Sequence, residues 1–395
     1  MQLKRVDVVT LTQKAVAQTM GAEYMEQVGD LGALDSYKLT DVGRAVTGSG
    51  TREVFSKALI SLLAKMVIDE RKYTGEIKSI FVDNFDWGGF VERVYFTPDQ
   101  IIDDDMWNLV NGQVYENSLK FFEPGVKAKI YEESKGFMIP SSWSEEVLKE
   151  AFNGWDEMTR FLSGRRTMVE NTLTLALQSY AHMLVSCGIA VSIGKTENAV
   201  HILTEAIAAG IIEEGTTAEE ALQNEAFNLF FMERIAEVRG YLADYGVGFN
   251  NGEIPTFTTD EDNKLILLKA VAKKFKFFGK RQSFNLKEIG FGDYEEVSKW
   301  QGYAASGTEN YSFGNVSTIM IAADSGNKLG IGTSAFTQSN VAGVVFDHRA
   351  MGLCPYKQKT TSNYVGSADF WNEYLHILVN YILDDNYPIV AFVLD

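Results

Sequence analysis

The stretch between residues 76 and 187 constrains the fold of this chain most. Two extended segments, Glu76–Thr97 and Val126–Ile139, come first and are joined by a polar loop that carries aspartates. A long helical stretch, Ser144–Cys187, follows directly. A two-stranded hairpin of this length cannot bury both of its faces within its own subunit, because a lone hairpin has no core. We therefore expect the hairpin to lie across a neighbouring chain.

The second half of the helical stretch, Arg166–Cys187, holds no glycine or proline before Gly188. At the rise of an α-helix it spans roughly 33 Å, long enough to form the axis of a domain. Asn153-Gly154 and Ser163-Gly164 interrupt the first half, so we predict that the continuous helix begins near Arg165. Apolar residues recur at steps of three and four and share one helix face. They are Val169, Leu173, Ala176, Leu177, Tyr180 and Leu184.

The flanking regions differ in pattern. The first fifty residues are typical of short helical pieces in an arm with little core of its own, and Arg52–Glu70 has the apolar stripe of an amphipathic helix. Helices are expected over Glu197–Ala209, Ala218–Tyr245 and Asp262–Phe278. Four strands are predicted near the C-terminus, at Val316–Ala322, Gly343–Arg349, Phe370–Ile382 and Pro388–Leu394. Helices and strands do not alternate as βαβ units, which indicates the α+β class.

The composition excludes several classes of protein. Apolar residues make up 46% of the 395, enough for a core, and the longest apolar runs fall far short of the ~18–20 residues that span a bilayer. No apolar signal-peptide core follows Met1–Arg5, so export is not expected. The net charge of −17 provides no overall basic surface for nucleic acid. Two cysteines and four scattered histidines offer neither a disulfide framework nor metal-ligand spacing.

Three glycine-containing segments could bind phosphate groups, but none has the required context. Gly194-Lys195-Thr196 resembles the end of a P-loop, yet five residues separate it from Gly188, and a helix lies upstream where a strand is needed. Gly290-Phe291-Gly292 and Gly330-Ile331-Gly332 lack the third glycine of a dinucleotide-binding fingerprint. We interpret all three as turns.

An acidic cluster could bind a divalent cation. Asp103–Asp105 has Asp99 and Glu116 nearby, but calcium loops place their ligands at alternate positions around a glycine. Solvated charges at a loop tip are the simpler interpretation.

Two further clusters could contact nucleic acid. The aromatic residues between Phe370 and Tyr387 lack interleaved lysine or arginine and are interpreted as core. The basic run between Lys273 and Arg281 could bind nucleic acid, but we favour pairing with acidic neighbours in an assembly. No nucleophile motif is found either. The sequence thus predicts no catalytic, cofactor-binding or metal-ligating residue and no cofactor, which indicates a structural protein and not an enzyme.

The order of several stretches carries a further signal. Phe85–Val94 has an aromatic–glycine turn before a strand, Trp107–Gln113 lies in the loop, and Lys129–Pro140 contains the returning strand. Leu148–Leu173 lies in the long helical stretch, and Phe370–Val393 lies in the closing strands, preceded by His348-Arg349. Together these cover most of residues 52–190 and 340–395.

Taken in this order, the stretches resemble the major capsid proteins of tailed bacteriophages, which share the Hong Kong 97-type fold. Among these, the sequence pattern of the stretches most resembles that of capsid proteins from podovirus-like phages of Gram-positive hosts. The resemblance implies an α+β subunit with six parts. They are an N-terminal arm (1–53), a helix leading into the hairpin (54–75), an extended loop (76–142), a spine helix of the peripheral domain (143–187), an axial domain (188–345) and C-terminal strands that return to the peripheral domain (346–395).

The same resemblance implies a function and partners. The protein would form hexamers and pentamers of an icosahedral shell that encloses double-stranded DNA without sequence-specific binding. A separate scaffolding protein and a portal are expected partners, with no membrane. The expected location is the virion, after assembly in the bacterial host cytoplasm.

Some relatives crosslink through a lysine, an asparagine and a glutamate. Lys127, Lys129 and Lys135 lie in the right loop, but nothing identifies their partners, so we predict no crosslink.

One alternative to a phage capsid is an encapsulin-like compartment shell of the same fold. Another is an enzyme whose carboxylate site would use Asp103–Asp105 with Glu116.

Overall fold

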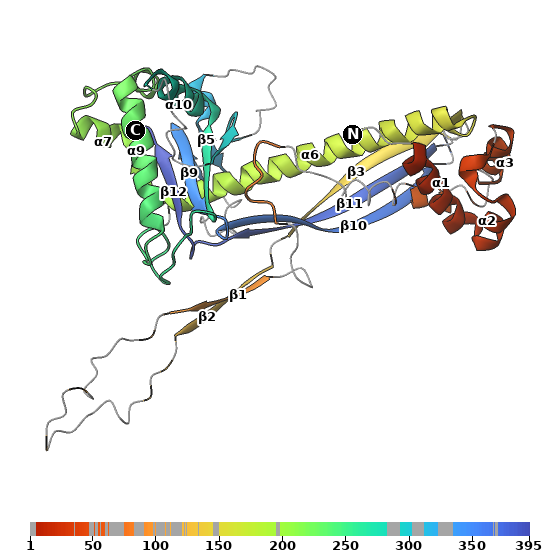
Figure 1. Ribbon diagram of the computed structural model, residues 1–395, viewed down its shortest axis with the longest axis horizontal. Coiled ribbons are helices and arrows are strands. Elements are labelled where there is room, and N and C mark those ends of the chain that lie inside the picture. Colours follow the sequence, from red (N-terminus) through yellow and green to blue (C-terminus); the bar gives the residue numbers. More distant parts are fainter. Residues whose placement is uncertain are drawn as a thin grey trace. The chain divides into compact units, whose positions relative to one another are not determined.

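The computed structural model shows a chain of mixed helices and strands, which confirms the predicted α+β class (Figure 1). By contacts the chain forms two compact units. Unit 1 comprises Met1–Lys78, Ser134–Ala181 and Cys354–Asn380, and unit 2 comprises Ser79–Glu133, His182–Leu353 and Tyr381–Asp395. The structure describes residues 5–34, 36–46, 51, 54–55, 57–59, 62, 75–82, 91–97, 99, 107, 111, 121, 123, 125–132, 134–144, 150–194, 198–282, 293–301, 312–322, 335–365, 367 and 370–395.

Unit 1 begins with a group of helices. Helix α1 spans Arg5–Met20, α2 spans Ala22–Val28, the 3-10 turn η1 spans Leu31–Ala33 and α3 spans Ser36–Val46. Glycines with positive φ lie on either side of α2, and glycine adopts this conformation at no steric cost. The described residues between 54 and 62 are also helical, within the predicted amphipathic helix.

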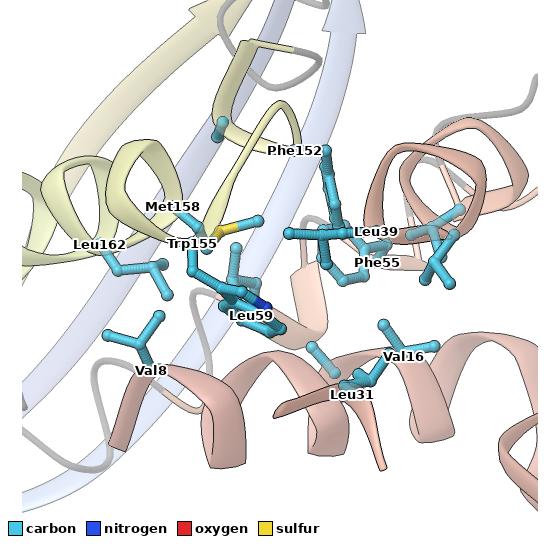
Figure 2. Packing of buried hydrophobic residues seen from close by; sticks show 14 of the residues in the cluster. Val8, Val16, Leu31, Leu39, Phe55, Leu59, Phe152, Trp155, Met158 and Leu162 are labelled. Carbon is cyan, nitrogen blue, oxygen red and sulfur yellow. The ribbon is translucent and has the colours of Figure 1, made fainter. Parts of the chain in front are cut away.

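These helices share one hydrophobic core with the start of α6, the helix Trp155–Gly194 (Figure 2). The ring centroids of Phe55 and Phe152 lie 5.6 Å apart. Gly43 permits this packing, because a Cβ there would lie 2.5 Å from the Phe152 side chain. The arm predicted to have little core of its own thus packs against residues from a distant part of the chain. The buried members include Val8, Val16, Leu31, Leu39, Phe55, Leu59, Phe152, Trp155, Met158 and Leu162.

Helix α6 is continuous over 40 residues. The prediction that it begins near Arg165 and ends before Gly188 is wrong. Its first turns are fixed by Trp155 and Met158 in the core of unit 1. Gly188 does not end the helix but allows close packing, because a Cβ there would lie 2.5 Å from Met351 Sδ. The length and composition of α6 would fit a membrane span, but 61% of its most apolar window is buried within the protein, as in a core helix.

A three-stranded sheet lies in the order β10-β11-β3, with β10 at Met351–Val365, β11 at Phe370–Leu383 and β3 at Ser134–Ser144. Strands β11 and β3 are antiparallel. The Phe137 ring packs against Tyr180 of α6, so the helix covers one face of this sheet. Met138, the next residue on β3, is 57% exposed on the other face.

The extended segment expected at Val126–Ile139 is divided between two sheets. Strand β2 (Val126–Tyr131) pairs with β1 (Val91–Phe96), whereas β3 pairs with β11. A period-two pattern specifies a strand but not its partner, so the sequence alone does not reveal this division.

Unit 2 is built on a five-stranded sheet in the order β4-β12-β9-β5-β6. Every residue of β9 and β12 is buried, so both faces of the sheet centre are covered. On one face, Phe231 of α9 (Glu225–Leu242) contacts Phe275 of α10 (Lys269–Gln282) and Phe392 of β12. The strands are β4 (Ala199–His201), β12 (Ile389–Val393), β9 (Val341–Asp347), β5 (Asn263–Leu268) and β6 (Glu295–Val297).

The smaller elements of unit 2 partly match the sequence pattern. The predicted capping box at Thr217 and Glu220 is confirmed at the start of α8. The helix expected over Asp262–Phe278 is wrong in its first part, because the run before Lys269 forms the buried strand β5 between β9 and β6. The remaining elements are α7 (Ile202–Ala208), α8 (Ala218–Ala221), α11 (Phe313–Val316), β7 (Ile319–Ile321) and β8 (Phe336–Gln338).

The core of unit 1 can be tested by truncating Phe152, which is 2% exposed. Replacing a buried phenylalanine by alanine costs about 3–5 kcal/mol, because it removes apolar burial and leaves a cavity. Denaturant unfolding of Phe152→Ala should show a loss of this size. The control Leu175→Ala removes a side chain that is 66% exposed on α6 and should cost less than about 0.5 kcal/mol. Equal effects of the two variants would contradict the packing.

Candidate assembly surface

The hairpin formed by β1 and β2 has two chemically different faces. Side chains alternate along each strand, so residues opposite one another in the register share a face. Arg93 pairs with Lys129 and Tyr95 with Lys127, which gives a polar face. The other face carries only exposed side chains, and we call its apolar members the outer strip. The outer strip consists of Val94, Phe96, Val126, Ala128 and Ile130.

The exposure of the outer strip is large for apolar side chains. Val94 is 48% exposed, Phe96 68%, Val126 51% and Ile130 56%. Tyr95, between two of these residues on β1, is only 6% exposed. The usual arrangement, apolar inside and polar outside, is thus inverted. Contiguous exposed apolar surface of this kind marks a site of interaction with another molecule.

The polar face is held in place by Asp384, whose side chain is completely buried at the end of β11. Arg93 Nη1 lies 2.7 Å from Asp384 Oδ2, and the Tyr95 hydroxyl donates a hydrogen bond to the same oxygen. The other oxygen, Oδ1, accepts from the backbone N–H and the Nδ2 of Asn386. The carboxylate is therefore fully bonded, as a buried charge requires.

Electrostatics agree with this geometry. Burial lowers the pKa of Arg93, but the field of Asp384 and its hydrogen bond outweigh burial and raise that pKa above its ordinary value. Burial and the hydrogen bond to Asp384 also raise the pKa of Tyr95, so its hydroxyl keeps its proton and donates. Arg93 and Tyr95 therefore remain bonded to Asp384 across the neutral pH range.

A second layer of contacts surrounds this group. Two guanidinium groups lie close to the Tyr387 ring, with Arg93 Cζ 5.5 Å and Arg349 Cζ 4.6 Å from its centroid. The Arg349 guanidinium donates two hydrogen bonds to Asp347, whose side chain is completely buried, and the Arg349 backbone N–H donates a third. Cations stacked on a tyrosine ring in this way are attracted by its π face.

Two lysines of β2 complete the attachment. Lys129 Nζ lies 3.1 Å from the largely buried Asp385, and Lys127 Nζ lies 3.1 Å from the exposed Glu253. The Lys127 pair is exposed on both sides and contributes about 0–1 kcal/mol. Both lysines, considered above for crosslinking, are thus paired within their own chain.

The other residues singled out from sequence do not form a common site in the described part of the chain. Asp103–Asp105, Glu116 and both Gly-x-Gly segments lie outside the described residues, as do Lys195 and Thr196. Lys276, in the basic run, pairs with Glu296 of its own chain. No cluster of three or more metal-ligating side chains occurs among the residues that the structure describes.

Sequence reasoning missed the group around Asp384. The only local signal is Asp384-Asp385-Asn386 directly after an apolar strand. The partners Arg93 and Tyr95 are 291 and 289 residues away, so no spacing rule connects them.

Comparison with known proteins identifies the family. The family of Phi29-like phage major capsid proteins matches residues 14–393. The chain belongs to this family. It is therefore a bacteriophage major capsid protein, a structural component of the virion shell. The resemblance to tailed-phage capsid proteins is confirmed, and neither the encapsulin-like compartment nor the carboxylate enzyme is favoured.

Several solved structures contain chains with some similarity to this one. The chain is similar to one in the capsid of Staphylococcus phage Andhra (11% identity, 82% of this chain and 88% of that chain, TM-score 0.49). Another similar chain is in the structure of the head fibre and inner core protein of native bacteriophage P68 (10% identity, 82% of this chain and 88% of that chain, TM-score 0.48). A third similar chain is in the capsid of cyanophage P-SCSP1u (10% identity, 82% of this chain and 92% of that chain, TM-score 0.43). No curated protein matches the chain.

The role of Asp384 can be tested with Asp384→Asn, which keeps the shape but removes the charge. Arg93 is then left largely buried without a counter-ion, and breaking such a pair costs about 3 kcal/mol or more. We expect a folded protein in which amide hydrogen exchange across Val91–Phe96 and Val126–Tyr131 is strongly accelerated. Lys127→Gln breaks only the exposed pair with Glu253 and should leave exchange in the hairpin nearly unchanged. Unchanged exchange in Asp384→Asn would contradict the anchoring role.

Proposed function

We propose that this capsid protein forms hexamers and pentamers of a closed icosahedral shell, in which each hairpin contacts a neighbouring copy through its outer strip. One observation carries the proposal: the polar face of the hairpin is attached to its own subunit, while the apolar strip, from Val94 to Ile130, is exposed. Burying apolar surface stabilises by roughly 25 cal/mol per Å², so exposed side chains of this size favour association. A copy of the same chain is the partner available in a shell of identical subunits.

The exposed face of the β10-β11-β3 sheet has the chemistry to receive the outer strip of a neighbour. A groove of about 430 Å³ runs over this sheet and is lined in part by Met138, Leu378 and His376. Lys357 and Lys359 also line the groove and are exposed. The hairpin carries exposed Glu92 beside its apolar strip, together with Glu123. Apolar and charged groups thus complement each other on the two surfaces.

We propose that the parts of the subunit keep the roles implied by the resemblance. Residues 1–53 act as the N-terminal arm, 54–75 lead into the hairpin and 76–142 form the extended loop. Helix α6 (Trp155–Gly194) supplies the spine, the residues after it up to 345 form the axial domain, and 346–395 return to the peripheral domain. The boundary between the two compact units falls after Ala181, within α6, which supports a division in the second half of this helix.

We also propose the remaining partners on chemical grounds. The shell encloses double-stranded DNA without sequence-specific binding, because a protein of net charge −17 repels phosphates overall. It assembles with a separate scaffolding protein and a portal in the host cytoplasm, and not on a membrane. We assign no catalytic, cofactor-binding or metal-ligating role to any of its described residues, in keeping with a family of major capsid proteins.

Electron microscopy of the protein, expressed alone and with a candidate scaffolding protein, tests the shell directly. We expect closed shells or rings of five and six subunits. A protein that stays monomeric under all of these conditions would overturn the proposal.

A double substitution tests the outer strip. Val94→Asp with Ile130→Asp places two charges on a surface that would be desolvated on assembly, which is strongly unfavourable. We expect a folded protein that no longer forms shells, as measured by sedimentation and microscopy. Val94→Thr with Ile130→Thr is the uncharged control and should weaken assembly much less. Normal shells from the aspartate variant would show that this strip is not an interface.

Charge reversal tests the receiving surface. Lys357→Glu with Lys359→Glu places like charges opposite Glu92 and should lower the yield of shells, most strongly at low salt, where charges are least screened. Adding Glu92→Lys should restore part of the yield. If reversal has no effect at any ionic strength, another surface receives the hairpin.

A further inference from the structure

A buried carboxyl group in unit 1 takes no part in the contacts described so far. Glu373 of β11 is 1% exposed, and neither of its carboxyl oxygens has a hydrogen-bond partner. It lies directly opposite Ser141 of β3 in the antiparallel register, on the same face as Leu375 and Ile377. A buried carboxyl group without a partner is costly, so its presence requires a physical explanation.

The nearest cation is bonded to other groups. Arg165 of α6 donates from Nη1 to Ser141 Oγ and from Nη2 to the carbonyl oxygen of Ser142, the latter at 3.0 Å. The guanidinium therefore links α6 to β3, beside Glu373 but without a hydrogen bond to it. Two arrangements of the same groups are possible, with Arg165 bonded either to the serines or to the carboxylate.

The charge state decides between these arrangements. Burial raises the pKa of Glu373 to about 8, and the field of Arg165 offsets burial only in part. Burial also lowers the pKa of Arg165. At neutral pH the Glu373 carboxyl is therefore mainly protonated, which agrees with the absence of an ion pair.

The surroundings supply little else that could control this carboxyl. Helix α6 also carries Arg166 here, whose Nε lies 3.9 Å from Glu170 of the same helix. On β10, Lys357 and Lys359 are exposed to solvent. Within the described part of the chain, Arg165 is the one charged group whose field acts appreciably on Glu373.

We propose that Glu373, Arg165 and Ser141 form a proton-controlled latch that joins β11, α6 and β3. While Glu373 is protonated, Arg165 stays bonded to the two serines and holds α6 to the end of β3. When Glu373 loses its proton to water, the buried carboxylate needs a counter-ion, and Arg165 exchanges its bonds to β3 for an ion pair with it. The link from α6 to β3 is then released. The latch is independent of how the hairpin contacts a neighbour.

Stability against pH provides the first test. A carboxyl group whose pKa is raised in the folded state stabilises the protein fully below its unfolded pKa, and this contribution is lost as pH rises toward about 8. The variant Glu373→Gln keeps the neutral shape and cannot ionise. We expect the denaturation midpoint of the wild type to fall relative to this variant between pH 5 and pH 8, and the difference to level off above. Parallel curves would overturn the latch.

A second variant separates a latch from a merely buried carboxyl. Ser141→Ala removes one acceptor of Arg165, so the guanidinium moves more readily to Glu373 and the midpoint of the pH effect should shift to lower pH. An unchanged midpoint would show that the two sites are not coupled. Hydrogen exchange of β3 and of the first turns of α6, measured above pH 8, should be faster in the wild type than in Glu373→Gln. Equal exchange at that pH would also overturn the proposal.

Discussion

The hairpin of this capsid protein depends on one buried carboxylate. Asp384 binds Arg93 and Tyr95 from the same strand, and both side chains point to the same face because they are two residues apart. Fixing this polar face inward forces the intervening residues outward, so Val94 and Phe96 are exposed. The apolar strip offered to a neighbour is thus a direct consequence of a polar anchor within the subunit.

Helix α6 supplies the other constraint, because its residues belong to both compact units. At one end Trp155 is buried in the core that α1 and α3 complete, and at the other Gly188 allows contact with Met351. Between them, Arg165 connects the helix to β3 beside the unpaired carboxyl of Glu373. Packing of its residues within each unit thus keeps α6 helical through Gly164 and Gly188.

Much of the element content could be predicted from sequence, whereas most of the site could not. Local patterns correctly indicated the long helix after Arg166, the strand at Gly343–Arg349 and the capping box at Thr217. The family was also predicted from the order of these stretches and is confirmed. The group around Asp384 escaped prediction, because its partners are hundreds of residues apart and the local signal is only an acidic turn.

The sequence by itself determined the α+β class, the amphipathic period of α6 and the alternation that gives the hairpin two faces, because all three depend on neighbours in the chain. Only the tertiary structure decided that α6 continues through Gly164 and Gly188, and that Val126–Ile139 divides between two sheets. It also decided which face of the hairpin is attached. These outcomes depend on partners brought together by packing, and burial energies at such contacts exceed the local preferences of a glycine or a strand.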